Sequence, residues 1–276
     1  MNIALVTDST SDIPDSLIEA KHIFMVPNSV NIDGQSFLDG IEISREEFYR
    51  RLPEFRSQPT TATASIGTYQ SLYSDLFQQG YERIISIHAS SLLSGIYNAA
   101  FSAAQSFGNR VSVIDSQHIS LGLGFQVLAA ADSIANGSPL ESVLEMIQNI
   151  RKRIRVVAML DTLEYVRRSG RVSWAKARIG GLLRIKPFVE VKEGKVLSLG
   201  EARTRQKGIK HLRNIITKLG HLERIAILHS NSEADACQLQ QDVKPIADDA
   251  SLLINVTTVI GVHVGPNGLG FAAIIT

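Results

Sequence analysis

Three apolar runs of five or six residues each end in a cluster of hydroxyl and carboxylate side chains. The runs are Ile3–Thr7, Arg83–His88 and Arg110–Ile114, and the clusters that follow them are Asp8–Ser11, Ser90–Ser94 and Asp115–Ser116. Because helical patterns separate the runs, the order predicts an α/β fold with a parallel sheet and helices on both faces. In such a sheet ligands bind beyond the carboxyl ends of the strands. We therefore expect the three clusters to converge on one edge of the sheet.

The stretch Ser90–Gly95 places three hydroxyls and a glycine between a predicted buried strand and a predicted helix. Free backbone N–H groups collect at the start of a helix, and serine is a favoured capping residue there. This place suits an anion, either a phosphate or a carboxylate. The alternative is an ordinary serine-rich capping loop, and the stretch alone does not decide between the two.

Two domains are the first expectation for a chain of 276 residues. The parallel-sheet pattern extends to residue 157, with a small hairpin insertion near residues 28–40 that turns at Asp33–Gly34. Residues 158–276 predict a smaller α/β domain with helices on a mixed sheet, and no linker marks the boundary. Within that second domain, residues 261–268 are rich in glycine and predict a loop, which would hold His263.

The charge is unevenly distributed along a chain whose net charge is only +1. Residues 1–50 hold nine acidic and three basic side chains, a balance of −6, whereas residues 151–213 hold eighteen basic and five acidic ones, a balance of +13. A solvated basic face is one interpretation. The other is a surface for an anionic partner, such as a protein, a phosphate or a lipid headgroup. Nucleic acid is not expected, because the basic segment lacks aromatic interleaving and zinc-finger spacing.

Several kinds of chemistry leave no trace in the sequence. The seven histidines form no metal-binding pattern, and neither a P-loop, a dinucleotide fingerprint nor a Gly-x-Ser-x-Gly elbow is present. No metal or cofactor is therefore expected. A serine hydrolase or thioesterase that pairs Ser94 with His263 stays open, as does a sensor of a phosphorylated metabolite. The single cysteine, the lack of a membrane-spanning apolar run and the lack of a signal-peptide pattern favour the cytoplasm.

Several segments together resemble the DegV family of bacterial fatty-acid-binding proteins, which includes the acyl-carrying B subunits of fatty acid kinase. The resemblance covers nearly the whole chain and depends on the order and spacing of the segments. The matching segments are Thr7–Asp12, Pro59–Thr61, Ser90–Tyr97, Asp115–Ser116, Leu163–Val172, Lys186–Pro187, Arg203–Arg205 and His263–Pro266.

The resemblance implies an α/β domain followed by a smaller α/β domain, with an acyl chain buried between or within them. It implies that Thr61, Ser94 and His263 hold the carboxylate of a long-chain fatty acid such as palmitate, stearate or oleate. Arg171, with Arg203 or Arg205, would position a phosphate or contact the kinase. The chain would then be a carrier that presents the acid to a separate kinase, with no catalysis of its own and with a transient contact to an anionic membrane.

The chain departs from the family pattern in two loops. Family members often carry Thr-Ser-Gln-Pro-Ser where this chain has residues 61–65, Thr-Ala-Thr-Ala-Ser. The family's Gly-Pro-Gly after the histidine is Gly265-Pro266-Asn267 here. Neither departure removes a side chain that the resemblance assigns to the carboxylate.

Overall fold

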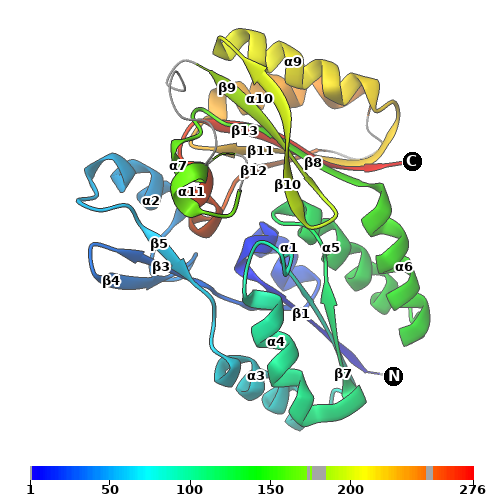
Figure 1. Cartoon of the computed structure of the whole chain (residues 1–276). Helices are drawn as coiled ribbons and strands as arrows, with labels where there is room; N and C mark the ends of the chain where they lie inside the picture. The colour runs from blue at the N-terminus through cyan, green and yellow to red at the C-terminus, as the bar shows by residue number, and fades with distance from the viewer. Residues whose placement is uncertain (1, 173–174, 176–184, 247–250) are drawn as a thin grey trace.

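The computed structural model describes residues 2–172, 175, 185–246 and 251–276 (Figure 1). Its N-terminal part contains a four-stranded parallel sheet in the order β2-β1-β6-β7. The strands are β1 (Ile3–Asp8), β2 (Ile23–Val26), β6 (Arg83–His88) and β7 (Val111–Asp115). The helices of this part are α1 (Asp15–Ala20), α3 (Ile66–Gln78), α4 (Ile96–Ala104), α5 (Leu121–Ala135) and α6 (Leu140–Arg153). The parallel sheet that the sequence predicts is confirmed.

A separate three-stranded antiparallel sheet, in the order β4-β3-β5, projects from this part. The predicted hairpin forms β3 (Ser29–Ile32) and β4 (Gln35–Leu38), and α2 (Arg45–Arg51) follows it. The third strand, β5 (Thr60–Ala62), was expected to be a loop. Three residues carry too little pattern to predict a strand, and this one exists because it pairs with β3, some thirty residues earlier.

The C-terminal part is built on a six-stranded mixed sheet in the order β10-β9-β8-β13-β11-β12. Its strands are β8 (Ile154–Met159), β9 (Lys186–Lys192), β10 (Lys195–Ala202), β11 (Leu222–Ser230), β12 (Leu252–Asn255) and β13 (Gly268–Ile275). Its helices are α7 (Glu164–Ser169), α9 (Arg205–Lys218), α10 (Glu233–Val243) and α11 (Thr258–Val264). The boundary drawn after residue 157 falls inside β8, all of which belongs to this sheet, so the change of sheet lies before Ile154.

The two faces of the six-stranded sheet contribute to two different cores. Val157 packs under α9 and α10 with side chains such as Leu212 and Leu239. Its neighbour Val156 points the other way and joins the core of the N-terminal part. In Figure 1, α9 and α10 cover the outer face of this sheet, and the N-terminal part lies against the inner face. Because side chains alternate along a strand, one face of the sheet packs under α9 and α10, and the other shares a core with the N-terminal part.

Short 3-10 helices occupy several connections: Ser9–Ser11, Leu52–Glu54, Gln105–Arg110 and Lys244–Ile246. Among the residues that the structure describes, no helix has both the length and the apolar character that a membrane crossing requires.

Candidate functional site

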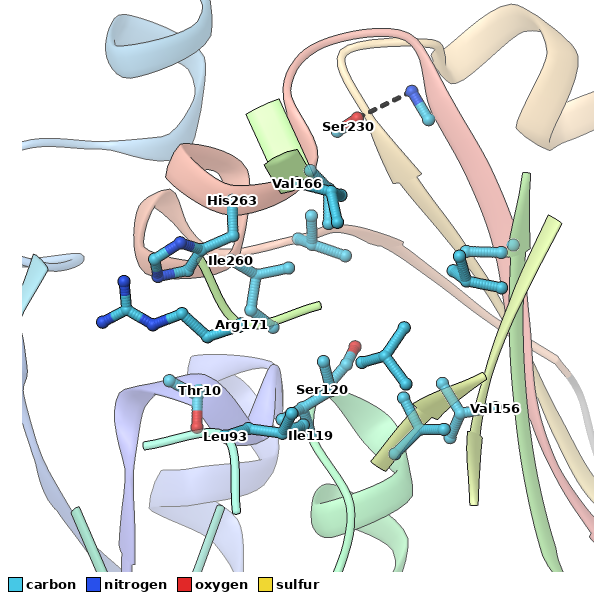
Figure 2. A pocket seen from close by; sticks show the side chains of 18 of the residues that line it. Thr10, Leu93, Ile119, Ser120, Val156, Val166, Arg171, Ser230, Ile260 and His263 are labelled. Atoms are coloured by element: carbon cyan, nitrogen blue, oxygen red, sulfur yellow. Dashed lines mark hydrogen bonds between the residues drawn. The ribbon is translucent and has the colours of Figure 1, made fainter. Parts of the chain in front are cut away.

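A pocket of about 170 Å³ lies between the loops of the parallel sheet and the inner face of the six-stranded sheet. A single water needs only ~10–15 Å³ by this measure, so the space suits a larger ligand. Most of its wall is aliphatic, with valine and leucine side chains from the inner sheet face facing Leu93 and Ile119. Figure 2 shows His263 and Arg171 together at one side of the pocket and Val156 at the opposite side. The pocket therefore has a polar end and an apolar end.

His263 marks the polar end. Its Nε2 atom lies 3.2 Å from Oγ1 of Thr61 in β5, and its buried Nδ1 atom has no hydrogen-bond partner among the residues that the structure describes. Burial, reinforced by the Arg171 guanidinium, lowers the pKa of His263 to about 4. The imidazole is therefore neutral at pH 7 and carries one N–H that can donate.

The position of His263 corrects the sequence interpretation. The residue lies in the last turn of α11 and not in a glycine-rich loop. Thr257 caps this helix by accepting from the backbone N–H of Ile260 (3.5 Å), and Gly265 ends it with a φ of 74°. The ring of Tyr165 fills the space that a Cβ atom at Gly265 would occupy. The glycines of this segment thus end the helix and allow close packing, and they do not loosen a loop.

Ser94 lines the same pocket from the turn before α4. Its Oγ atom accepts from the backbone N–H of Ile96 (3.3 Å), a contact that leaves the hydroxyl proton available to a ligand. The other two hydroxyls of the stretch serve the fold. Ser90 donates to the carbonyl of Gly194 (2.9 Å), and Ser91 donates to the carboxylate of Asp115 (2.6 Å).

The structure brings together four of the six side chains that the sequence singles out: Thr61, Ser94, Arg171 and His263 all line the pocket. Arg171 is exposed and donates to the carbonyl of Ser169 (2.6 Å). Arg203 and Arg205 do not line it. Arg203 is exposed on the C-terminal part.

Arg205 is occupied by contacts within the fold. Its Nε atom lies 2.6 Å from Oδ2 of Asp235, and its Nη1 atom donates to the carbonyl of Asn267 (2.7 Å). A second carboxylate, on Asp161, lies 3.7 Å from Nη1. Arg205 therefore joins α9 to α10 and to the turn before β13, a role that its position in a basic segment did not reveal.

The polar clusters converge as the sequence predicts. Ser91 bonds to Asp115 across the sheet edge, and the backbone N–H of Ser116 donates to the carbonyl of His88 (3.0 Å). Four further hydroxyl residues, none of them singled out as a site residue, also line the pocket: Thr10, Ser120, Ser169 and Ser230. Thr10 is held by Asp8 (2.5 Å) and Ser120 by Asp12 (2.5 Å). Thr10 belongs to the cluster Asp8–Ser11 at the end of a predicted strand, which could have indicated it. No such pattern surrounds Ser120 in the sequence.

The hydrolase hypothesis requires a carboxylate on the second nitrogen of His263, and within the described residues that atom has no partner. A serine–histidine–aspartate row does exist elsewhere. Ser86 lies 2.7 Å from Nε2 of His88, whose Nδ1 lies 3.0 Å from Asp8, and all three side chains are fully buried. Ser86 is also bonded to Tyr73 (2.8 Å). This row is a core network that a substrate cannot reach.

No group of three or more metal-ligating side chains was found in the part of the chain that the structure describes. The chemistry available at the polar end is therefore that of hydroxyls, a neutral imidazole and one exposed guanidinium. Such donors suit a single carboxylate that enters from an apolar surrounding.

The comparisons with known proteins identify the family. Residues 2–276 match the profile of a family described as uncharacterised proteins of the DegV family. A DegV domain-containing protein of Caldanaerobacter subterraneus is 34% identical over 273 residues, which cover 97% of each chain. The chain belongs to the DegV family.

Solved structures of two relatives share the fold over their whole length. A DegV family protein from Thermus thermophilus, described for its fatty acid binding, superimposes with a TM-score of 0.92 at 34% identity and covers 100% of both chains. DegV from Bacillus subtilis, described as a fatty acid binding protein, superimposes with a TM-score of 0.88 at 32% identity, again over 100% of both chains. The fold that the sequence resemblance implied is confirmed.

Proposed function

We propose that this protein binds a long-chain fatty acid, with its tail in the apolar part of the pocket and its carboxylate at Thr61, Ser94 and His263. The observation that carries the proposal is the polarity of the pocket. Its walls are largely aliphatic, and at one end a partly unsatisfied histidine contacts the hydroxyl of Thr61, while Ser94 lines the same pocket. The fatty acid binding described for the Thermus thermophilus and Bacillus subtilis relatives supports the same ligand class.

The energetics match an acid of this kind. Each buried methylene contributes about 0.8 kcal/mol, so a tail of roughly fifteen methylenes supplies the affinity. The carboxylate contributes little affinity but must be hydrogen-bonded once it leaves water, since an unsatisfied buried charge is costly. The hydroxyls of Thr61 and Ser94 and the N–H of His263 meet that need. A phosphorylated metabolite would place its polar body against the aliphatic wall and is disfavoured.

The acid can be identified by native mass spectrometry of the protein as purified from cells. We expect a co-purified C16–C18 acid, such as palmitate, stearate or oleate. If the protein carried no acid and acquired none after incubation with these three, the proposal would be wrong.

Adjacent threonines provide a matched pair for the carboxylate site. Thr61 lines the pocket, whereas Thr60 is exposed on the same short strand and does not line it. We expect Thr61→Val to raise the dissociation constant for palmitate about tenfold, the effect of losing one hydrogen bond to a charged group. Thr60→Val should change it less than twofold. Equal effects would contradict the assignment of Thr61.

The proposal extends to a carrier role in the cytoplasm: the protein presents the acid to a separate fatty acid kinase and carries the acyl phosphate onward, without catalysis of its own. The exposed guanidinium of Arg171 beside the polar end supports this step, because it can meet a phosphoryl group or an acidic partner. The basic balance of residues 151–213 would attract the same partner or, transiently, an anionic membrane.

A charge reversal tests the carrier role separately from acid binding. With a cognate kinase, Arg171→Glu should lower acyl-phosphate formation at least tenfold while the palmitate dissociation constant stays within threefold. Lys218→Glu, which reverses an exposed charge at the end of α9 and outside residues 151–213, is the control and should leave the rate unchanged. An unchanged rate for Arg171→Glu would contradict the role of this residue and leave acid binding standing.

A further inference from the structure

The connection between β12 and α11 is held from the N-terminal part at four consecutive residues. Each of residues 255–258 forms a hydrogen bond with a different side chain of that part. The contacts are Arg45 Nη1 to Asn255 O (2.6 Å), Tyr49 Oη to Val256 O (3.2 Å), Thr257 N to Asp12 Oδ1 (2.8 Å), and Thr258 N and Oγ1 to Asp39 Oδ1 (3.2 and 2.7 Å). We call Asp12, Asp39, Arg45 and Tyr49 the clamp.

The carboxylates of the clamp are costly to bury. Asp12 and Asp39 are each 1% exposed, and the nearest cation, Arg45, lies 3.7 Å from Asp12. Burial raises the pKa of Asp12 to about 6, against the opposing effect of Arg45, and it also raises the pKa of Asp39. Buried carboxylates that are incompletely paired lower stability, so their presence calls for a role beyond packing.

The element that the clamp holds is the helix that carries His263. His263 lies five positions after Thr258, which corresponds to about 7.5 Å along a helix. The middle of α11 is also tightly fitted, because a Cβ atom at Gly261 would lie 2.6 Å from the hydroxyl of Tyr49. Val259 and Ile260 line the pocket between the clamp and the histidine. A shift at the start of α11 therefore moves the imidazole relative to Thr61.

We propose that Asp12 and Asp39 are positioning residues for carboxylate recognition, which act by fixing the start of α11 so that the His263 imidazole faces the acid. This inference rests on the proposed function, since it assigns a role in binding the same ligand. Neither carboxylate touches the acid itself. Their backbone bonds decide where the helix begins, and the helix decides where the imidazole lies.

The test compares two ligands with the same tail. Palmitate and hexadecan-1-ol both bury the chain, but only palmitate requires the carboxylate donors. In a competition assay against a fluorescent long-chain probe, Asp12→Ala and Asp39→Ala, which remove the oxygen that accepts from α11, should raise the dissociation constant for palmitate about tenfold and that for hexadecan-1-ol less than threefold. Asp33→Ala is the matched control, because Asp33 also accepts backbone N–H groups but lies on the exposed β3–β4 turn.

A second readout follows the imidazole directly. By NMR titration, the pKa of His263 should rise from about 4 toward its ordinary value in the clamp variants, because a displaced ring gains water, and it should not move in Asp33→Ala. Tyr49→Phe removes one hydrogen bond of the clamp and keeps its bulk. Should the aspartate variants fail to fold, this variant should show the same selective loss for palmitate, by about threefold.

The outcomes separate the inference from the function on which it rests. Equal loss of acid and alcohol binding, or no loss of either, would overturn the role of the clamp and leave fatty acid binding intact. A wild-type protein that binds neither ligand would overturn the proposed function and this inference together.

Discussion

Two histidines, His88 and His263, lie in polar networks of opposite character. His88, in the core of the N-terminal part, uses both ring nitrogens: Nδ1 contacts Asp8 (3.0 Å) and Nε2 contacts Ser86 (2.7 Å). His263, at the pocket, uses only one, toward Thr61, and its Nδ1 has no partner among the described residues. The first network is complete within the protein, whereas the second needs one more partner.

The difference indicates which polar cluster can bind a ligand. In a complete buried network the donors and acceptors are already paired within the protein, so none is available to a ligand. The inaccessible row of Asp8, His88 and Ser86 is such a network, and it specifies the fold. An unsatisfied nitrogen is not sufficient, however. Within the described part of the chain the Nδ1 atom of His118 is also buried without a partner, but this residue does not line the pocket that His263 lines. An incomplete network at a pocket wall is the combination that marks the site.

The largest effect is expected from the complete network. Asp8→Ala removes the carboxylate that accepts from Thr10 and Ala89 and pairs with His88. Removal of one partner of a buried pair costs about 3–5 kcal/mol, so the free energy of unfolding in urea should fall by that amount. If Asp8→Ala cost less than about 1 kcal/mol, or if His263→Gln were equally destabilising, the two networks would not differ in their contribution to stability.

An effect of intermediate size is expected from pH. The pKa of His263 falls from 6.5 in the unfolded chain to about 4 in the folded protein. Its contribution to stability is therefore present above pH 6.5 and is lost as the pH falls toward 4, by about 3 kcal/mol in total. The free energy of unfolding of wild type and of His263→Gln can be measured at pH 7 and at pH 4. The advantage of wild type over the variant should be smaller at pH 4 by this amount.

The contribution of Asp12 to stability should depend on pH in the opposite direction. Its pKa rises to about 6 in the folded protein, so its contribution is present in acid and is lost as the pH rises through 6. Asp12→Asn should therefore gain stability relative to wild type as the pH rises from 4 to 7. If the difference in unfolding free energy between wild type and His263→Gln did not depend on pH, the imidazole would be solvated, which would contradict the burial of its Nδ1 atom.

The smallest effects on stability and the most selective effects on binding belong to the polar end of the pocket. Ser94→Ala and His263→Gln should each weaken palmitate binding by about 10- to 100-fold, since a hydrogen bond to a charged group is worth roughly 1.5–3 kcal/mol. At pH 7 neither should change the free energy of unfolding by more than about 1 kcal/mol. If these two variants lowered the free energy of unfolding but left palmitate binding unchanged, the polar end of the pocket would serve the fold and not the ligand.

The sequence predicted the features that depend on local pattern. The strand-to-loop transitions at Asp8, Ser90 and Asp115 have a clear period and a clear end, and the structure has them at one sheet edge. The family resemblance supplied Thr61 and His263, which lie 202 positions apart and which local pattern could not have paired.

The remaining features depend on tertiary contacts. The strand β5 exists through its pairing with β3, and α11 forms in a segment that contains two glycines, where Thr257 caps it and Asp12 and Asp39 accept from the backbone N–H groups at its start. Arg205 was assigned to a partner surface, but which acid lies within 3 Å of a given arginine is decided by the folded chain. The extension of β8 across the expected boundary likewise follows from its pairing with β9 and β13.

A crystal structure of the complex with palmitate would locate the carboxylate and the tail of the bound acid. We expect a carboxylate oxygen within about 3.2 Å of a ring nitrogen of His263 and of the hydroxyls of Thr61 and Ser94, with the tail directed toward Val156. A palmitate bound outside this pocket, or bound in reverse with its carboxylate beside Val156, would contradict this expectation.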